Sequence, residues 1–154
     1  RKKLDWFNGY YIRQKTNKEL LQLIESFAPK NAETGLIGKT IPLVKERITK
    51  LSDYASFAGF FFNEPVVDKS LFTSQASDQL SQAKTVLESL TNWDKSEIEF
   101  KLKELISKNG WQTGDFFMNL RIAITGSKFT PPITDSVAIL GKEKTLERLI
   151  KCLK

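Results

Sequence analysis

Residues 41–62 read IPLVKERITKLSDYASFAGFFF, and this stretch decides the fold class. Its apolar residues recur three or four positions apart: Ile41, Val44, Ile48, Leu51, Ala55, Ala58 and Phe62. This spacing places them on one face of an α-helix. Pro42 suits the first turn, where the missing N–H has no partner to lose. The pattern predicts one long helix that ends before Pro65.

The same periodicity continues on both sides of this stretch. Asn17 is a candidate N-cap for a helix that ends near Pro29. Residues 77–90 form a second apolar stripe, and Ser96 with Glu99 has the spacing of a capping box for a third helix. The residue pair Asn109-Gly110 is typical of that helix's end. Residues 31–39 carry no clear pattern and are expected to form a flexible connection.

The last third of the chain is also helical in pattern. Residues 113–125 are expected to bury Phe117, Leu120 and Ile124, and Asp135 is a candidate cap for a short helix that Gly141 ends. The final helix has apolar residues at Leu146, Leu149, Ile150 and Leu153. No convincing strand pattern is present, so the sequence predicts an all-α protein, with residues 63–71 as a linker between two lobes.

Composition restricts the chemistry of the chain. Its 24 basic residues exceed its 18 acidic ones, which gives a net charge of +6 and favours a polyanionic partner. The absence of histidine, together with the single cysteine, Cys152, argues against a zinc site and against histidine-dependent nucleophilic catalysis. An internal disulfide is excluded, which agrees with a reducing, cytoplasmic environment. No apolar run approaches the roughly 20 residues that span a bilayer.

The most informative candidate site is residues 120–133, LRIAITGSKFTPPI. An apolar helix with one arginine, Arg121, gives way at Gly126 to a loop that carries Lys128, Phe129 and Thr130. A cation, a hydroxyl and a flat ring on a stiff backbone suit an unpaired base. The alternative is an ordinary turn between helices.

Two further groups could contact nucleic acid. Arg47, Lys50 and Tyr54 would share one flank of the long helix, where a guanidinium could bind a base edge beside a stacking ring. The N-terminal residues RKKLDWFNGYYIR combine basic and aromatic side chains suited to phosphate contacts. The alternatives are a solvated face with a half-buried Tyr54, and an N-terminal helix packed through its apolar residues.

The sequences of these regions resemble segments of a known protein family. KLDWFNGYYIR is similar to the segment that follows the catalytic part of bacterial glutamyl-tRNA synthetases. LRIAITGSKFTPPI and AILGKEKTLERL resemble the signature that closes the same enzymes. The resemblance covers essentially the whole chain and implies a two-lobed α-helical cage that binds the anticodon of tRNA.

The resemblance also implies roles for individual residues. It assigns the reading of the third anticodon base to Arg47. An arginine at this position implies a preference for glutamate tRNA over glutamine tRNA. Further anticodon contacts are assigned to Arg121. The Thr-Pro step at Thr130 and Pro131 would contact the first bases, with Ile133 nearby. Pro132 stands where relatives commonly have glycine. Secondary contacts to the backbone or to bases are expected at Lys2, Lys3, Trp6, Asn8, Arg13, Lys50, Tyr54, Lys128 and Phe129.

The organisation that follows has three parts: residues 1–15 as the tail of a stem-contact region, 16–68 as a first anticodon-binding lobe and 69–154 as a second. The ATP-binding motifs of the family are absent, so the stretch is expected to be non-catalytic and to hold no cofactor or metal. ATP and Mg²⁺ are implied for the full-length ligase. The expected partners are tRNA for glutamate and the enzyme's own N-terminal catalytic domain, in a cytoplasmic monomer. The alternative is a helical protein-interaction module that does not bind RNA.

Overall fold

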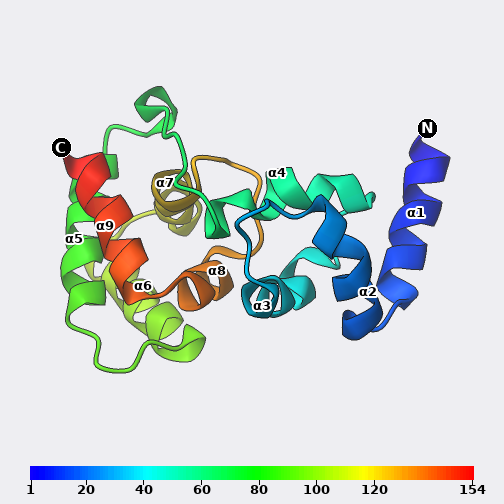
Figure 1. Cartoon of the computed structure of the whole chain (residues 1–154). Helices are drawn as coiled ribbons and strands as arrows, with labels where there is room; N and C mark the ends of the chain where they lie inside the picture. The colour runs from blue at the N-terminus through cyan, green and yellow to red at the C-terminus, as the bar shows by residue number, and fades with distance from the viewer. The chain divides into compact units, whose positions relative to one another are not determined.

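The computed structural model describes residues 1–154 and contains helices without any strand, which confirms the predicted all-α class. The chain divides into two compact units, Arg1–Glu64 and Pro65–Lys154. Each unit is described on its own below, with the helix labels of Figure 1.

The first unit consists of short helices. These are α1 (Lys2–Gln14), α2 (Asn17–Ile24), η1 (Glu25–Phe27), α3 (Thr34–Val44), η2 (Leu51–Asp53), α4 (Tyr54–Ala58) and η3 (Gly59–Phe61). A capping box opens α2, because the Thr16 hydroxyl accepts from the Glu19 amide at 3.1 Å while the Glu19 carboxylate accepts from the Thr16 amide at 2.9 Å. The cap is therefore Thr16, one residue before the predicted Asn17.

The prediction of a single long helix over residues 41–62 is wrong. The α3 helix ends at Val44, and Lys50 adopts an extended conformation before η2 begins. A competing hydrogen-bond acceptor explains the break: the Asp53 carboxylate accepts from the amides of Thr49 at 3.3 Å and Lys50 at 3.1 Å. Pro42 consequently lies in the last turn of α3 instead of its first turn.

Residues 31–39 are likewise not a flexible connection. The side-chain amide of Asn31 donates to the Phe62 carbonyl and to the Asn63 side chain, each at 3.3 Å. Thr34 already belongs to α3. Isoleucines of α3 then enter the core, where Ile37 and Ile41 are buried.

Tyr54 does not lie on an accessible flank with Arg47 and Lys50. Its side chain is fully buried, and its hydroxyl is 2.7 Å from the Thr40 hydroxyl on α3. Stacking of a base on Tyr54, as expected from the sequence, is excluded in this conformation because the core covers the ring. The break after Val44 causes the change, since it turns α4 and inserts Tyr54 between the helices.

Burial of Tyr54 makes the stability of the first unit sensitive to alkaline pH. Desolvation raises the pKa of the phenol above its usual 10.0, although the Thr40 hydrogen bond opposes this rise. A raised pKa gives stability that is present below pH 10 and lost as the pH rises through the folded-state value. We expect the free energy of unfolding to fall more steeply above pH 10 in the native chain than in Tyr54→Phe. Urea titrations at several pH values measure the free energy of unfolding. Tyr10→Phe, which alters an exposed ring, should show the same dependence of this free energy on pH as the native chain.

The second unit contains η4 (Lys69–Leu71), α5 (Ala76–Glu88), α6 (Lys95–Asn109), α7 (Thr113–Thr125), α8 (Ile133–Leu140) and α9 (Lys142–Leu153). Helix α5, green in Figure 1, packs against α6, α7 and the red C-terminal α9. A polar cluster joins α5 to α7: the side-chain amide of Asn119 donates to the Gln79 side chain at 2.7 Å and to the Thr73 hydroxyl at 2.8 Å. This cluster also fixes the segment that precedes α5.

Several predicted helix ends and buried residues differ in detail. The cap of α6 is Asp94, whose carboxylate accepts from the Glu97 amide at 2.9 Å, and not Ser96. In α7 the buried ring is Phe116, whereas Phe117 is only half-buried. Asp135 lies in the first turn of α8 and forms an ion pair with Lys95 at 3.1 Å instead of capping the helix. Gly110, with φ of 65°, ends α6 as predicted.

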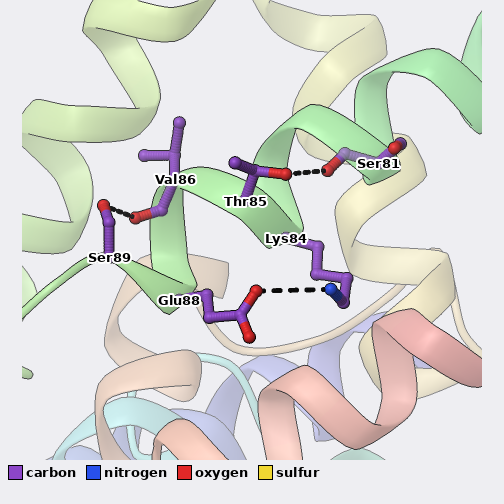
Figure 2. Close-up of polar contacts among 6 residues, drawn as sticks. All are labelled: Ser81, Lys84, Thr85, Val86, Glu88 and Ser89. Carbon is purple, nitrogen blue, oxygen red and sulfur yellow. Dashed lines mark hydrogen bonds and ion pairs between the residues drawn. The ribbon is translucent and has the colours of Figure 1, made fainter.

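Figure 2 shows that the last turns of α5 satisfy their own polar groups. The Thr85 hydroxyl donates to the Ser81 carbonyl at 3.2 Å, and Lys84 pairs with Glu88 at 3.3 Å along the helix. The Ser89 hydroxyl donates to the Val86 carbonyl at 2.7 Å. Because these contacts are local and largely exposed, this part of α5 is a solvated face.

No helix combines the length and apolar character required to cross a membrane. No cluster of three or more acidic or cysteine side chains is arranged to hold a metal ion.

Candidate nucleic-acid interface

The loop after α7 is shaped by its own polar groups. Gly126 ends the helix in the left-handed region with φ of 74°. The Thr125 hydroxyl donates to the Arg121 carbonyl at 2.8 Å and accepts from the Ser127 amide at 3.1 Å. The helix end and the first loop residue are thereby tied together, so the loop leaves α7 in a defined direction.

The middle of this loop presents an aromatic ring to solvent. The Ser127 hydroxyl accepts from the Phe129 amide at 3.0 Å, which closes a serine turn around Lys128. Phe129 is 83% exposed, the most exposed ring in the chain, and Lys128 is exposed beside it. An exposed ring beside a cation on an ordered loop offers an accessible face on which a base can stack, which makes it a candidate stacking surface.

The second half of the loop is buried. The Thr130 side chain is 5% exposed and its hydroxyl donates to the Pro131 carbonyl at 2.8 Å; Pro131 is buried and Ile133 is 4% exposed. The family resemblance implied contact of the Thr130–Pro131 step with the first anticodon bases, with Ile133 at a nearby apolar contact. In this conformation their side chains face the interior and hold the loop, while Lys128 and Phe129 form its outer face. Contact of the Thr-Pro step with bases stays a prediction.

Two arginines of the second unit lie on α7 and α9. Arg121 on α7 is half-buried, and its Nε is shielded from solvent. Arg148 on α9 is only 7% exposed, and its Nη1 donates to the Ile124 carbonyl at 2.8 Å. A cation at the carbonyl end of α7 is favoured by the helix dipole as well as by the hydrogen bond. Arg148 therefore anchors the helix end from which the loop departs.

Sequence reasoning missed the role of Arg148. The available signal was an arginine next to Leu149 on the apolar stripe of the last helix, where a charged residue needs a buried acceptor. Lys142 is a similar case: its ammonium donates to the Leu90 carbonyl at 2.6 Å, at the start of the α5–α6 connection. Both residues belong to the AILGKEKTLERL motif, and both serve the fold.

In the first unit, the predicted contact residues form two groups. Arg47 is exposed and Lys50 is half-buried, both in the turn between α3 and η2. On α1, Lys2 and Lys3 are exposed and Trp6 is 59% exposed.

Asn8 and Arg13 of α1 are half-buried. Trp6 stacks on Tyr10 with ring centroids 5.8 Å apart and planes 16° apart, so α1 presents a continuous aromatic surface among cations. Of the residues predicted in this unit, only Tyr54 is removed from the surface.

The chain matches known proteins over nearly its whole length. A family model described as an anticodon binding domain matches residues 18–153. Among curated relatives, the glutamate–tRNA ligase of Borreliella afzelii (strain PKo) is 31% identical over 95% of this chain and 33% of its own length. That of Treponema denticola is 30% identical over 99% of this chain and 37% of its own length.

Solved structures agree with these relatives. A glutamate tRNA ligase from Elizabethkingia meningosepticum, crystallised with its amino acid, has a TM-score of 0.84 at 25% identity over 97% of this chain and 31% of that one. The synthetase of Elizabethkingia anophelis has a TM-score of 0.77 at the same 25% identity. The chain therefore spans about a third of the length of the proteins that it matches, and the family resemblance seen in the sequence is confirmed.

Proposed function

We propose a function from the premise that this chain belongs to the family of anticodon binding domains: it binds the anticodon loop of a tRNA for glutamate. The observation that carries the proposal is the ordered loop at residues 127–132, which presents Phe129 and Lys128 to solvent. The similarity to glutamate–tRNA ligases supports glutamate tRNA as the partner. No observation favours the alternative of a protein-interaction module without RNA.

The proposed mechanism is recognition of unpaired bases. Anticodon bases are single-stranded, so they can be displaced from their stack, placed on an aromatic ring and read along their edges. Phe129 offers the ring, and Lys128 offers a cation beside it for a flanking phosphate. Arg47 and Arg121 have the planar donors that read a base edge with two hydrogen bonds. Lys2 and Lys3 would add salt-dependent contacts that carry no sequence information.

The larger protein in this proposal is a glutamate–tRNA ligase, an aminoacyl-tRNA synthetase that acts in the cytoplasm. In this proposal ATP and Mg²⁺ are used by a catalytic domain outside the present stretch. These 154 residues supply tRNA recognition and no reacting group. The intact enzyme would act as a monomer, because one such recognition surface suffices for one anticodon.

Arg47 offers the sharpest test of base reading. We expect Arg47→Ala to lose most of its preference between anticodon stem-loops that differ only at the third base. The loss should be about tenfold to hundredfold, by analogy with the 1–3 kcal/mol carried by a bidentate arginine contact to a DNA base. Binding is measured by fluorescence anisotropy at a fixed salt concentration.

The matched control is Lys45→Ala, which removes a cation from the same turn without removing a guanidinium. It should weaken both stem-loops alike and leave their ratio unchanged. An undiminished preference in Arg47→Ala would exclude Arg47 from reading the third base.

A further inference from the structure

The first unit contains a pocket that includes neither Arg47 nor any residue of the 127–132 loop, although two predicted secondary contacts, Asn8 and Lys50, line it. Its volume is about 350 Å³, within the range of small-ligand sites. Helix α1 with Lys15 forms one wall, the end of α2 with η1 forms the second, and the turn before η2 together with the first residues of η2 forms the third. The lining residues are Asn8, Tyr11, Ile12, Lys15, Leu23, Phe27, Thr49, Lys50, Leu51 and Ser52.

The walls of this pocket are apolar and aromatic. Tyr11 is 61% exposed, and Leu23 and Phe27 are each 40% exposed, although all three are large apolar side chains. They come from separate helices and face a common space, so their exposure is concentrated instead of scattered. A flat group could stack on the Tyr11 or Phe27 ring while its edge meets Asn8 and Ser52, which supply donors and acceptors.

Cations flank the apolar walls. Lys15 and Lys50 both line the pocket, are half-buried and form no ion pair. Asp53 is the carboxylate beside Lys50, and its Oδ2 is already occupied by the amides of Thr49 and Lys50. The pocket therefore combines a stacking surface with two available positive charges, which matches a planar base that carries a phosphate.

We propose that this pocket binds one unpaired nucleotide of the tRNA outside the anticodon triplet, with its base on Tyr11 and its phosphate between Lys15 and Lys50. The proposal rests on the proposed tRNA-binding function and adds a second nucleotide site to it. Lys50 lies three residues after Arg47 in the same turn, so one RNA strand can reach both residues. The pocket would increase affinity without reading the anticodon.

The first experiment follows the pocket directly, by recording NMR spectra of the whole chain during titration with uridine or adenosine monophosphate. Shifts of the Tyr11 and Phe27 ring signals are expected with both monophosphates, with weaker shifts for the uncharged nucleosides. The peptide acetyl-Glu-Leu-Glu-amide is titrated in parallel. Shifts of these rings with the peptide and none with either monophosphate would overturn the proposal in favour of a protein partner.

Variants give the second readout. Tyr11→Ser should weaken monophosphate binding about fivefold or more, since base stacking on an aromatic ring is a large part of such binding. Lys15→Met/Lys50→Met should weaken it about threefold to tenfold, the range for exposed charge contacts. Phe100→Ser and Lys18→Met change exposed residues that do not line the pocket, and both should bind as the native chain does.

The same variants separate this proposal from the function on which it rests. Tyr11→Ser should bind a glutamate-tRNA anticodon stem-loop more weakly while keeping its preference among anticodon bases. If monophosphates leave the rings unshifted while the anticodon preference persists, the pocket proposal fails alone. If monophosphates bind the pocket but no stem-loop shows any anticodon preference, the proposed function fails instead.

Discussion

Replacing Gly126 by alanine should lower the free energy of unfolding of the second unit by about 2–4 kcal/mol. Two effects act together at this position. The backbone has φ of 74°, where any Cβ is strained, and an ideal Cβ would lie 2.6 Å from the Val66 carbonyl oxygen. Because the nearest atom belongs to backbone and not to a flexible side chain, the helix end or the residue 65–66 segment must move.

Gly110 provides a matched control for this effect. It also has positive φ, at 65°, but no atom lies within 4 Å of the position that an alanine Cβ would take there. Gly110→Ala should therefore show the conformational strain alone, about 1–2 kcal/mol. Urea titration followed by tryptophan fluorescence in a Trp6→Phe background reports the second unit, which holds Trp93 and Trp111. Equal losses in both variants would show that Gly126 is not in close contact with Val66.

Replacing Arg148 by methionine should destabilise the second unit by about 2–4 kcal/mol. Methionine keeps much of the apolar volume but removes the charged hydrogen bond to the Ile124 carbonyl at 2.8 Å. The carbonyl is then left in the interior without that donor, and the cation that complements the end of α7 is lost. The loop that follows α7 should lose order as well, since Arg148 fixes the turn from which it starts.

The control for charge is Lys144→Met on the same helix, where the side chain is exposed. It should change the free energy of unfolding by less than about 0.5 kcal/mol. Arg148→Lys should be intermediate, because an ammonium keeps the charge but not the planar fork. A loss in Arg148→Met no larger than in Lys144→Met would refute the anchoring role.

The sequence predicted the helices of the second unit well because their boundaries are local. Residues 113–125 are helical as expected, since the apolar spacing and Gly126 both act within a few residues. The caps were harder to place: Thr16 and Asp94 compete with neighbouring polar residues, and only the actual hydrogen bonds distinguish them.

The long helix failed for a different reason. Periodicity over residues 41–62 is compatible with a continuous helix, but the Asp53 carboxylate offers the amides of Thr49 and Lys50 another acceptor. Tyr54 is buried as a consequence, because its hydroxyl reaches Thr40 only when the chain turns between them. The spacing of apolar residues cannot predict that a side-chain carboxylate will compete with the helix for these backbone amides.

The candidate site shows the same division. Its loop was visible in the sequence as a change from an apolar helix to a mixture of lysine, phenylalanine and prolines. The sequence did not show which side chains of the loop point inward and which point outward. Thr130 turns inward, where its hydroxyl donates to the Pro131 carbonyl, while Phe129 turns outward. That choice depends on hydrogen bonds and packing that no local pattern specifies.

Recognition of the anticodon by this chain is tested by comparing its affinities for two RNA hairpins at the same salt concentration. One is the anticodon stem-loop of glutamate tRNA, and the other has the same stem and loop length with all three anticodon bases changed. We expect the chain to bind the first hairpin about tenfold or more tightly than the second, and Phe129→Ala to weaken this binding. Equal affinities for the two hairpins would contradict anticodon recognition by this chain.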